Sequence, residues 1–191
     1  QAGLRAQGVL SIVDYPGFQD LPEPDLETWS KALNAGQYPL SVLGMNARAA
    51  AIYRKGVYGN TMTTNPRALD VATTVLTLVT PEVRRNIVER GREFVEKFKT
   101  LMDELDGRIT QVQGTGLLFS VELDGQRYKA YGAGSTEEYL REHGINVIHG
   151  GENSLRYTPG FSTTSAEVDL IVEATRDALL NGPVKQVDQA A

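Results

Sequence analysis

Residues 25–40 read Asp25-Leu-Glu-Thr-Trp-Ser-Lys-Ala-Leu-Asn-Ala-Gly-Gln-Tyr-Pro-Leu40, and this stretch decides how the chain is interpreted. Apolar and polar residues alternate over 26–31, which predicts a short β-strand that ends at Lys31. A lysine at a strand end that faces a cavity can form a Schiff base with an aldehyde cofactor, provided its amine is desolvated. On spacing alone, a solvated lysine at the start of a helix is the favoured interpretation.

A second stretch of sequence favours the Schiff-base interpretation of Lys31 instead. It reads Gly56-Val-Tyr-Gly-Asn-Thr-Met-Thr-Thr-Asn-Pro66. Together the two blocks resemble the class III aminotransferases, pyridoxal-phosphate enzymes of fold type I. In that family a Lys-Ala/Gly-Leu-x-x-Gly-x-Tyr/Phe-Pro segment carries the Schiff-base lysine, and a later Thr-aromatic-x-x-Asn-Pro segment binds the cofactor phosphate across the dimer interface. Lys31 matches the lysine and Thr61 matches the threonine, with Met62 in place of the aromatic residue.

The resemblance implies a pyridoxal 5'-phosphate site made by Lys31, Thr61 and Asn60. A hydroxyl and backbone N–H groups in the Gly59-Asn60-Thr61 turn can hold a dianion. The alternative is an ordinary polar turn, which explains the small residues equally well. In the family geometry Thr61 serves the neighbouring subunit, so we expect a homodimer with shared active sites.

A third match lies near the C-terminus. Asn153-Ser-Leu-Arg-Tyr-Thr-Pro159 resembles the family's Leu/Ile-Arg-Phe-x-Pro-Pro segment, whose arginine binds the substrate α-carboxylate in several members. Guanidinium geometry suits a carboxylate, so Arg156 is the predicted substrate-binding residue. The equally weighted alternative is an arginine that holds two domains together. Gln113 stands where many members have arginine in Arg-Gly-x-Gly, which weakens the expectation of a second carboxylate contact there.

Helix signals divide the chain. Asn65-Pro66 and Thr80-Pro81 each predict a helix start, and the second helix carries a long apolar stripe. Capping boxes at residues 135–138 and 164–167 predict two further helices. Strands are expected near 9–13, 40–45, 109–113, 117–123, 145–148 and 154–157. We therefore expect an α/β fold, with residues 1–79 ending a large cofactor-binding domain and residues 80–191 forming a small α+β domain.

The composition narrows the function classes. The net charge of −5 over 191 residues disfavours a nucleic-acid partner, and the absence of cysteine removes disulfides and thiolate chemistry. With only two histidines, His143 and His149, a multi-histidine metal site is excluded. No apolar run has the length of a membrane helix, so a cytoplasmic location is the default. His149 could reach a site entrance, although a histidine at a strand end is more often structural.

The opening residues Gln1-Ala-Gly resemble the family's Asp-Glu-x-Gln-Thr-Gly segment cut at the glutamine. The aspartate that pairs with the pyridine nitrogen, the phosphate loop and the ring-stacking aromatic residue belong to the family's N-terminal half. We therefore expect this chain to be the C-terminal half of an enzyme, with the N-terminal half as its partner.

The expected function is that of a transaminase which moves an amino group from an amine or ω-amino acid to a 2-oxo acid. Racemases, decarboxylases and aminomutases of the same fold use the same lysine, so they remain alternatives. A non-catalytic fragment used for assembly is the alternative from another class.

Overall fold

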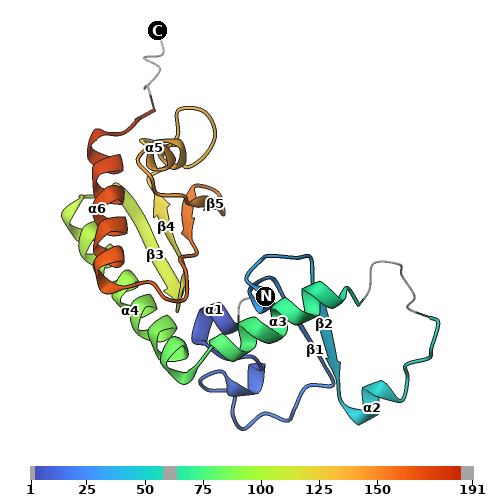
Figure 1. Cartoon of the computed structure of the whole chain (residues 1–191). Helices are drawn as coiled ribbons and strands as arrows, with labels where there is room; N and C mark the ends of the chain where they lie inside the picture. The colour runs from blue at the N-terminus through green and yellow to red at the C-terminus, as the bar shows by residue number, and fades with distance from the viewer. Residues whose placement is uncertain (1–2, 58–63, 186–191) are drawn as a thin grey trace. The chain divides into compact units, whose positions relative to one another are not determined.

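The computed structural model describes residues 3–57 and 64–185. The chain forms two compact units, residues 1–85 and residues 86–191, each with its own sheet (Figure 1). Helices and strands are both present, as the predicted α/β class requires. None of the described helices is long and apolar enough to cross a membrane.

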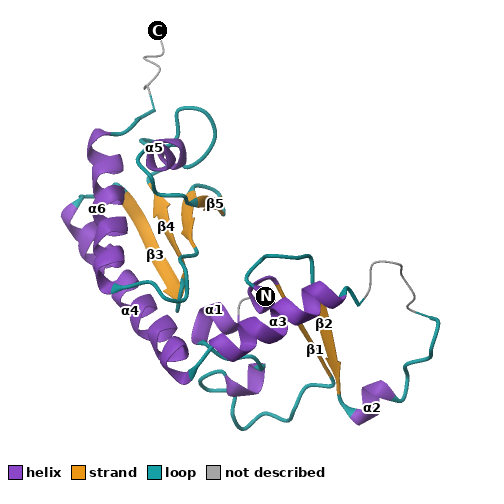
Figure 2. Cartoon of the chain, in the orientation of Figure 1, coloured by secondary structure: helices purple, strands orange, loops and turns teal. Residues whose placement is uncertain are grey.

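The first unit contains a two-stranded antiparallel sheet, β1 (Leu26–Ser30) and β2 (Ser41–Met45), paired from Leu26 opposite Met45 to Ser30 opposite Ser41 (Figure 2). Its helices are α1 (Gly3–Gln7), η1 (Ile12–Asp14), η2 (Lys31–Asn34), α2 (Ala47–Ala50) and α3 (Pro66–Leu78). The apolar side chains buried in this unit are three alanines and three larger residues, namely Leu4, Ala6, Leu33, Ala68, Ala72 and Val79.

The predicted strand near residues 9–13 is wrong. Residues 12–14 form the 3₁₀-helix η1, and the Ser11 hydroxyl caps it by accepting from the Val13 N–H at 3.4 Å. Ser11 also donates to Glu27 Oε2 at 2.9 Å, and the Ile12 N–H donates to Glu27 Oε1 at 2.8 Å. Hydrogen bonds from side chains to nearby backbone groups compete with strand pairing, and in this segment they stabilise a 3₁₀-helix instead of a strand.

The two predicted helix starts are confirmed. Asn65 caps α3 by accepting from the Arg67 N–H at 3.0 Å, with Pro66 in the first turn. The chain's longest described helix, α4 (Pro81–Glu104), follows, and Gly107 comes after its end with φ 74° in the left-handed region. At the start of α4, Arg84 Nη1 donates to the Gly8 carbonyl at 2.7 Å, which ties this end to the residue after α1.

The second unit contains a four-stranded antiparallel sheet in the order β3-β4-β6-β5 (Figure 2). The strands are β3 (Ile109–Thr115), β4 (Leu118–Leu123), β5 (Ile148–Gly150) and β6 (Ser154–Tyr157). The helices α5 (Thr136–Glu142) and α6 (Ser165–Asn181) begin at the predicted caps Ser135 and Thr164. The capping box at Thr164 is complete, because Glu167 bonds back to the Thr164 backbone.

Aromatic rings from α4 and the sheet form the core of this unit. Phe94 lies 4.4 Å from Phe119, and Tyr157 lies 5.1 Å from Phe119 and 5.2 Å from Phe98, measured between ring centroids. The Tyr157 hydroxyl is 2.8 Å from the Thr175 hydroxyl on α6. Burial raises the pKa of Tyr157 and outweighs the opposing bond to Thr175, so this phenol is neutral.

Helix α4 touches the turn between β3 and β4 without any side chain in between. A Cβ atom added at Gly91 would collide with the backbone of Gly116. Gly91 is buried within α4, and Gly116 has φ 54°. Glycine at position 91 therefore sets how closely helix and hairpin approach.

We expect Gly91→Ala to destabilise the protein by about 1–3 kcal/mol because the new methyl group overpacks this contact. In an open helix position the same change would stabilise by about 1 kcal/mol, so the sign is diagnostic. Urea unfolding measures it. Gly160→Ala is the matched control, since a Cβ there meets nothing within 4 Å. Equal or greater stability of Gly91→Ala would contradict the collision.

Candidate functional site

Lys31 follows strand β1 directly and opens η2. The strand therefore ends at Ser30, one residue earlier than predicted. Lys31 has φ 52°, in the left-handed region that non-glycine residues rarely occupy, and its side chain is exposed. Such outliers cost about 1–3 kcal/mol, and Lys31 shares a positive φ with Ala35, Thr64 and Asp106 among the described non-glycine residues.

The residues after Lys31 are fixed by burial and hydrogen bonds. Leu33 and Asn34 are 8% and 1% exposed, and η2 packs against α1 and α3. Asn34 Nδ2 donates to the Tyr38 carbonyl at 2.8 Å, and Ser30 Oγ donates to the Leu40 carbonyl at 3.0 Å. These bonds close the loop that joins the two strands, and they hold the strained residue in place.

Trp29 anchors the strand rather than extending the site. Its indole Nε1 donates to the Leu10 carbonyl at 2.7 Å, and a Cβ at Gly44 would lie 2.7 Å from its ring. A strand that ran through Lys31 would place Trp29 and Lys31 on the same face. Because the strand ends at Ser30, alternation does not place Trp29 on the face of Lys31.

The two other predicted cofactor ligands, Asn60 and Thr61, lie outside the described residues. On the C-terminal side the description resumes at Thr64, which has φ 56°, followed by the cap Asn65. Their assignment therefore stays a prediction.

Arg156 lies in the second unit, on strand β6, where it is exposed between the buried Leu155 and Tyr157. It pairs with Ser120 on β4 and with Ile148 on β5. With none of the described residues does its guanidinium form a hydrogen bond or ion pair. The structure thus presents Arg156 on the sheet face opposite the aromatic core, with all its donors unused.

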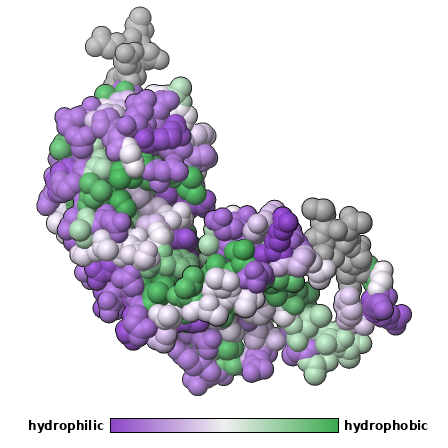
Figure 3. Space-filling view, viewed as in Figure 1, coloured by the Kyte–Doolittle hydropathy of each residue, from purple (hydrophilic) through white to green (hydrophobic). Residues whose placement is uncertain are grey.

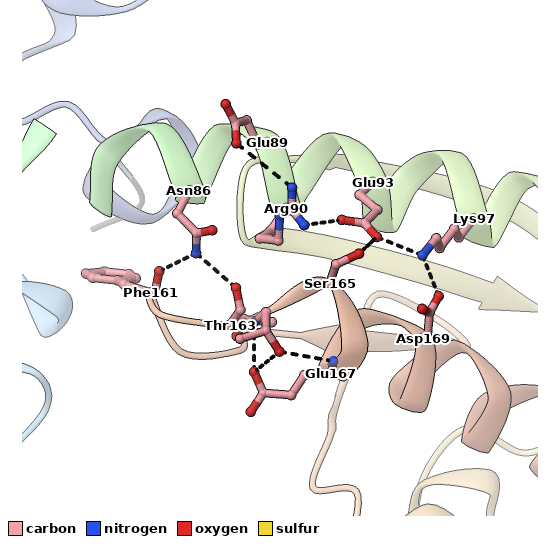
Figure 4. Close-up of polar contacts among 11 residues, drawn as sticks. Asn86, Glu89, Arg90, Glu93, Lys97, Phe161, Thr163, Ser165, Glu167 and Asp169 are labelled. Atoms are coloured by element: carbon pink, nitrogen blue, oxygen red, sulfur yellow. Dashed lines mark hydrogen bonds and ion pairs between the residues drawn. The ribbon is translucent and has the colours of Figure 1, made fainter. Parts of the chain in front are cut away.

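The segment after Arg156 is held by Asn86, a residue that the sequence reasoning missed. Asn86 Nδ2 donates at 2.9 Å to both the Phe161 and the Thr163 carbonyls (Figure 4). An amide that binds two carbonyls far along the chain leaves no local sequence signal. Asn86 therefore fixes the connection from β6 to α6.

An ion network continues along α4 from that point (Figure 4). Glu93 accepts from Arg90 and from Lys97, each at 2.7 Å, and from the Ser165 hydroxyl on α6. Lys97 also pairs with Asp169. Burial disfavours the charged form of Glu93, but the bonds from Lys97 and Ser165 and the charge of Arg90 outweigh it and lower the pKa of this carboxyl.

His149 belongs to a contact within the second unit. Its ring stacks on Tyr131 with centroids 4.3 Å apart, and Nδ1 is 3.3 Å from Glu137 Oε2. This favours the structural interpretation of His149. Among the described residues, no group of three or more histidine, aspartate or glutamate side chains is placed to hold a metal ion.

The chain is similar in structure to solved aminotransferases and in sequence to one protein family. The solved ornithine delta-aminotransferase of Plasmodium falciparum matches 94% of this chain with a TM-score of 0.81 and 24% identity, over 44% of that chain. The solved ornithine aminotransferase of Toxoplasma gondii matches 94% of this chain with a TM-score of 0.79 and 26% identity, over 41% of that chain. The chain therefore has the fold of the pyridoxal-phosphate aminotransferases. The family model "Aminotransferase class-III" matches residues 18–179, and the chain belongs to that family.

Curated relatives that are similar in sequence are also named aminotransferases. Ornithine aminotransferase 2 of Staphylococcus aureus is 29% identical over 177 residues, which are 92% of this chain and 41% of that protein. Acetylornithine aminotransferase of Xanthomonas axonopodis pv. citri is 28% identical over 169 residues, 88% of this chain and 40% of that protein. The chain thus spans about two fifths of the length of these relatives.

We expect Glu93→Gln to lower the free energy of unfolding at pH 7 by about 1–2 kcal/mol, measured by urea titration. The pKa of Glu93 is lowered on folding, so its contribution is present above the unfolded pKa and is lost as the pH falls through the folded value. The difference between wild type and variant should therefore be constant above about pH 5 and shrink below about pH 4.

Glu89→Gln provides the control, because that side chain is 61% exposed and lies 3.9 Å from Arg90. It should change stability by less than about 0.5 kcal/mol at every pH. A constant difference between wild type and Glu93→Gln down to pH 3 would show that Glu93 is not the linked group.

Proposed function

We propose that this chain provides the Schiff-base lysine and a carboxylate-binding arginine to a pyridoxal-phosphate transaminase. The enzyme would move an amino group from an amine or ω-amino acid to a 2-oxo acid. The observation that carries the proposal is the position of Lys31 directly after strand β1, inside the family match at residues 18–179. We also propose a cytoplasmic location.

The described residues fit the cofactor. Lys31 supplies a primary amine, and no ion pair or hydrogen bond to another described residue occupies it. When bound, pyridoxal phosphate supplies the aldehyde and the electron sink for the reaction. Lys31 Nζ would hold the cofactor and then carry a proton to and from the substrate carbon. Arg156 would orient the substrate through its carboxylate.

The relatives support the donor class. Two of them are called ornithine and acetylornithine aminotransferase, and ornithine carries both an α- and an ω-amino group. An ω-amino acid donor also has a carboxylate, which a guanidinium such as Arg156 would bind. We therefore favour an ω-amino acid over a simple amine as the donor.

Thr61 and Asn60 complete the proposal as ligands of the cofactor phosphate. Following the family geometry, we propose a homodimer in which Thr61 serves the site of the other subunit. A hydroxyl next to backbone N–H groups would bind a phosphate dianion without a further positive charge.

The N-terminal half of the family fold is the second proposed partner. Leu26, Leu43 and Met45 lie on one face of the two-stranded sheet and are 56%, 51% and 39% exposed. A two-stranded sheet has only marginal stability by itself. Apolar side chains also reach the surface in other parts of the molecule (Figure 3). Asn34 Oδ1 is buried without a hydrogen bond from any described residue. Further residues of the same fold would cover this face and supply that donor.

Borohydride reduction of the protein with pyridoxal phosphate tests the role of Lys31. We expect mass spectrometry to find the pyridoxyl-phosphate group on Lys31, because reduction fixes the cofactor on the lysine that holds it. The other five lysines, at positions 55, 97, 99, 129 and 185, should be labelled much more weakly.

Lys31→Ala should remove the label, whereas Lys55→Ala, which changes another exposed lysine of the same unit, should leave it. The proposal fails if all six lysines are labelled to the same extent, because that is the pattern of free aldehyde in solution.

Mixing two inactive variants tests the shared site. In the enzyme assembled with the N-terminal half, Lys31→Ala and Thr61→Ala should each lose transaminase activity, and an equal mixture refolded together with that half should recover about a quarter of it. Half of the dimers would then be hybrids, and each hybrid has one intact site. No recovery, with dimers confirmed by light scattering, would place Thr61 in the site of its own subunit, and full activity of Thr61→Ala alone would place it outside any site.

A further inference from the structure

Strand β3 forms one edge of the four-stranded sheet, and the described residues leave its outer side open. In the order β3-β4-β6-β5 it pairs with β4 on one side only (Figure 2). No backbone hydrogen bond joins residues 111–114 to any described residue outside the sheet. Gly114 is exposed, and because glycine has no side chain this exposure belongs to the backbone itself. An open row of N–H and C=O groups is a template for a further strand.

Sheet edges are usually protected against such pairing, and β3 has little protection. The opposite edge, β5, has only three residues, and shortness is one form of protection. Strand β3 has seven residues, with neither proline nor a charged side chain among them. A register shift between Ile109 and Gln111 disturbs one end, but residues 111–115 pair with β4 without interruption. This regular part of the edge is available to another strand.

Two glutamines mark the open strand on the sheet face away from the aromatic core. Gln111 and Gln113 are exposed, whereas Val112 between them is buried. Gln111 Nε2 donates to Gln113 Oε1 at 3.4 Å. Among the described residues this bond leaves the Gln111 side-chain oxygen as an unused acceptor and the Gln113 amide nitrogen as an unused donor. The edge therefore presents one acceptor and one donor, two residues apart.

A two-fold axis at Val112 would match these two groups. Two identical strands that pair antiparallel about Val112 place Gln111 of each copy opposite Gln113 of the other. Directly opposed side chains have Cβ atoms about 4.5–5.5 Å apart, within reach of a hydrogen bond between amides. The unused donor of one copy then meets the unused acceptor of the other, and it does so twice. Parallel pairing in register would oppose acceptor to acceptor and donor to donor.

The charges on this face permit the pairing. Glu122 on β4 pairs with Gln111 and therefore lies on the same face, one strand in from the edge. In the paired copies the two Glu122 residues would be three strand spacings apart, about 14 Å. That separation exceeds the screening length of about 8 Å at physiological ionic strength. Repulsion between the copies is therefore weak.

We propose that β3 is a docking edge for a second copy of this chain, through antiparallel β3–β3 pairing centred on Val112. The sheets of the two copies would then form one continuous sheet. So few paired residues make a small interface, so the association is weak and depends on concentration. It requires only the second unit, and it is separate from the dimer proposed through Thr61, whose position belongs to the first unit.

Hydrogen–deuterium exchange of the 191-residue chain tests the docking edge. A dimer through the first unit would also add mass, so the measurement must be local to β3. We expect the peptide that covers residues 109–115 to exchange more slowly as the protein concentration rises, because pairing protects the outward N–H groups. The concentration at half-maximal protection gives the dissociation constant.

Charge variants test the register. Gln111→Lys together with Gln113→Lys opposes lysine to lysine and should weaken the association about tenfold or more. Gln111→Lys together with Gln113→Glu opposes lysine to glutamate twice and should associate at least as tightly as wild type. The matched control, Gln126→Lys together with Ser162→Lys, adds the same charge at exposed positions outside β3 and should change affinity less than about twofold.

Three results would overturn the proposal. The first is exchange of β3 that does not depend on concentration. The second is a lysine–glutamate variant that associates as weakly as the lysine–lysine variant, which would exclude the antiparallel register. The third is protection of β3 by the N-terminal half of the family fold in place of a second copy, which would assign the edge to that half. None of them touches the labelling of Lys31, so this proposal and the transaminase proposal fail separately.

Discussion

The burial of Leu155 and Tyr157 is the constraint on which the second unit depends. Both side chains point into the aromatic core, and the Tyr157 hydroxyl reaches Thr175 on α6. Side chains alternate along a strand, so Arg156 between them must point outward. A slip of β6 by one residue would put Arg156 into the core and both apolar side chains into water. The burial of Leu155 and Tyr157, which stabilises the unit, therefore also determines which sheet face carries the guanidinium of Arg156.

Much of the fold could be predicted because local signals and tertiary structure agree. The Asn65-Pro66 start, the apolar stripe of α4 and the capping box at Thr164 each describe an interaction between near neighbours. Lys31 and Arg156 were predicted as site residues from their motifs, and those roles stay predictions; the structure places Lys31 directly after a strand and Arg156 on the sheet face opposite the aromatic core. The division into domains at residues 79 and 80 stays a prediction, as does the assignment of the second unit to the small domain of the family.

What could not be predicted depends on contacts between distant residues. Ser11 forms a cap instead of a strand because Glu27, in another element, accepts its hydroxyl. Asn86 fixes the connection from β6 to α6 by donating to the carbonyls of Phe161 and Thr163. No periodic sequence pattern predicts these two bonds. The positive φ of Lys31, next to the buried Leu33 and Asn34, follows from no local sequence pattern, since lysine itself does not favour it.

The backbone at Lys31 also bears on how far this protein could be stabilised. Glycine adopts a φ of 52° without steric cost, whereas a lysine there strains the chain by about 1–3 kcal/mol. A search for sequences that fold best onto this backbone would therefore replace Lys31 with glycine and delete the amine. At this position the sequence that folds best would lack the amine that the proposed function requires.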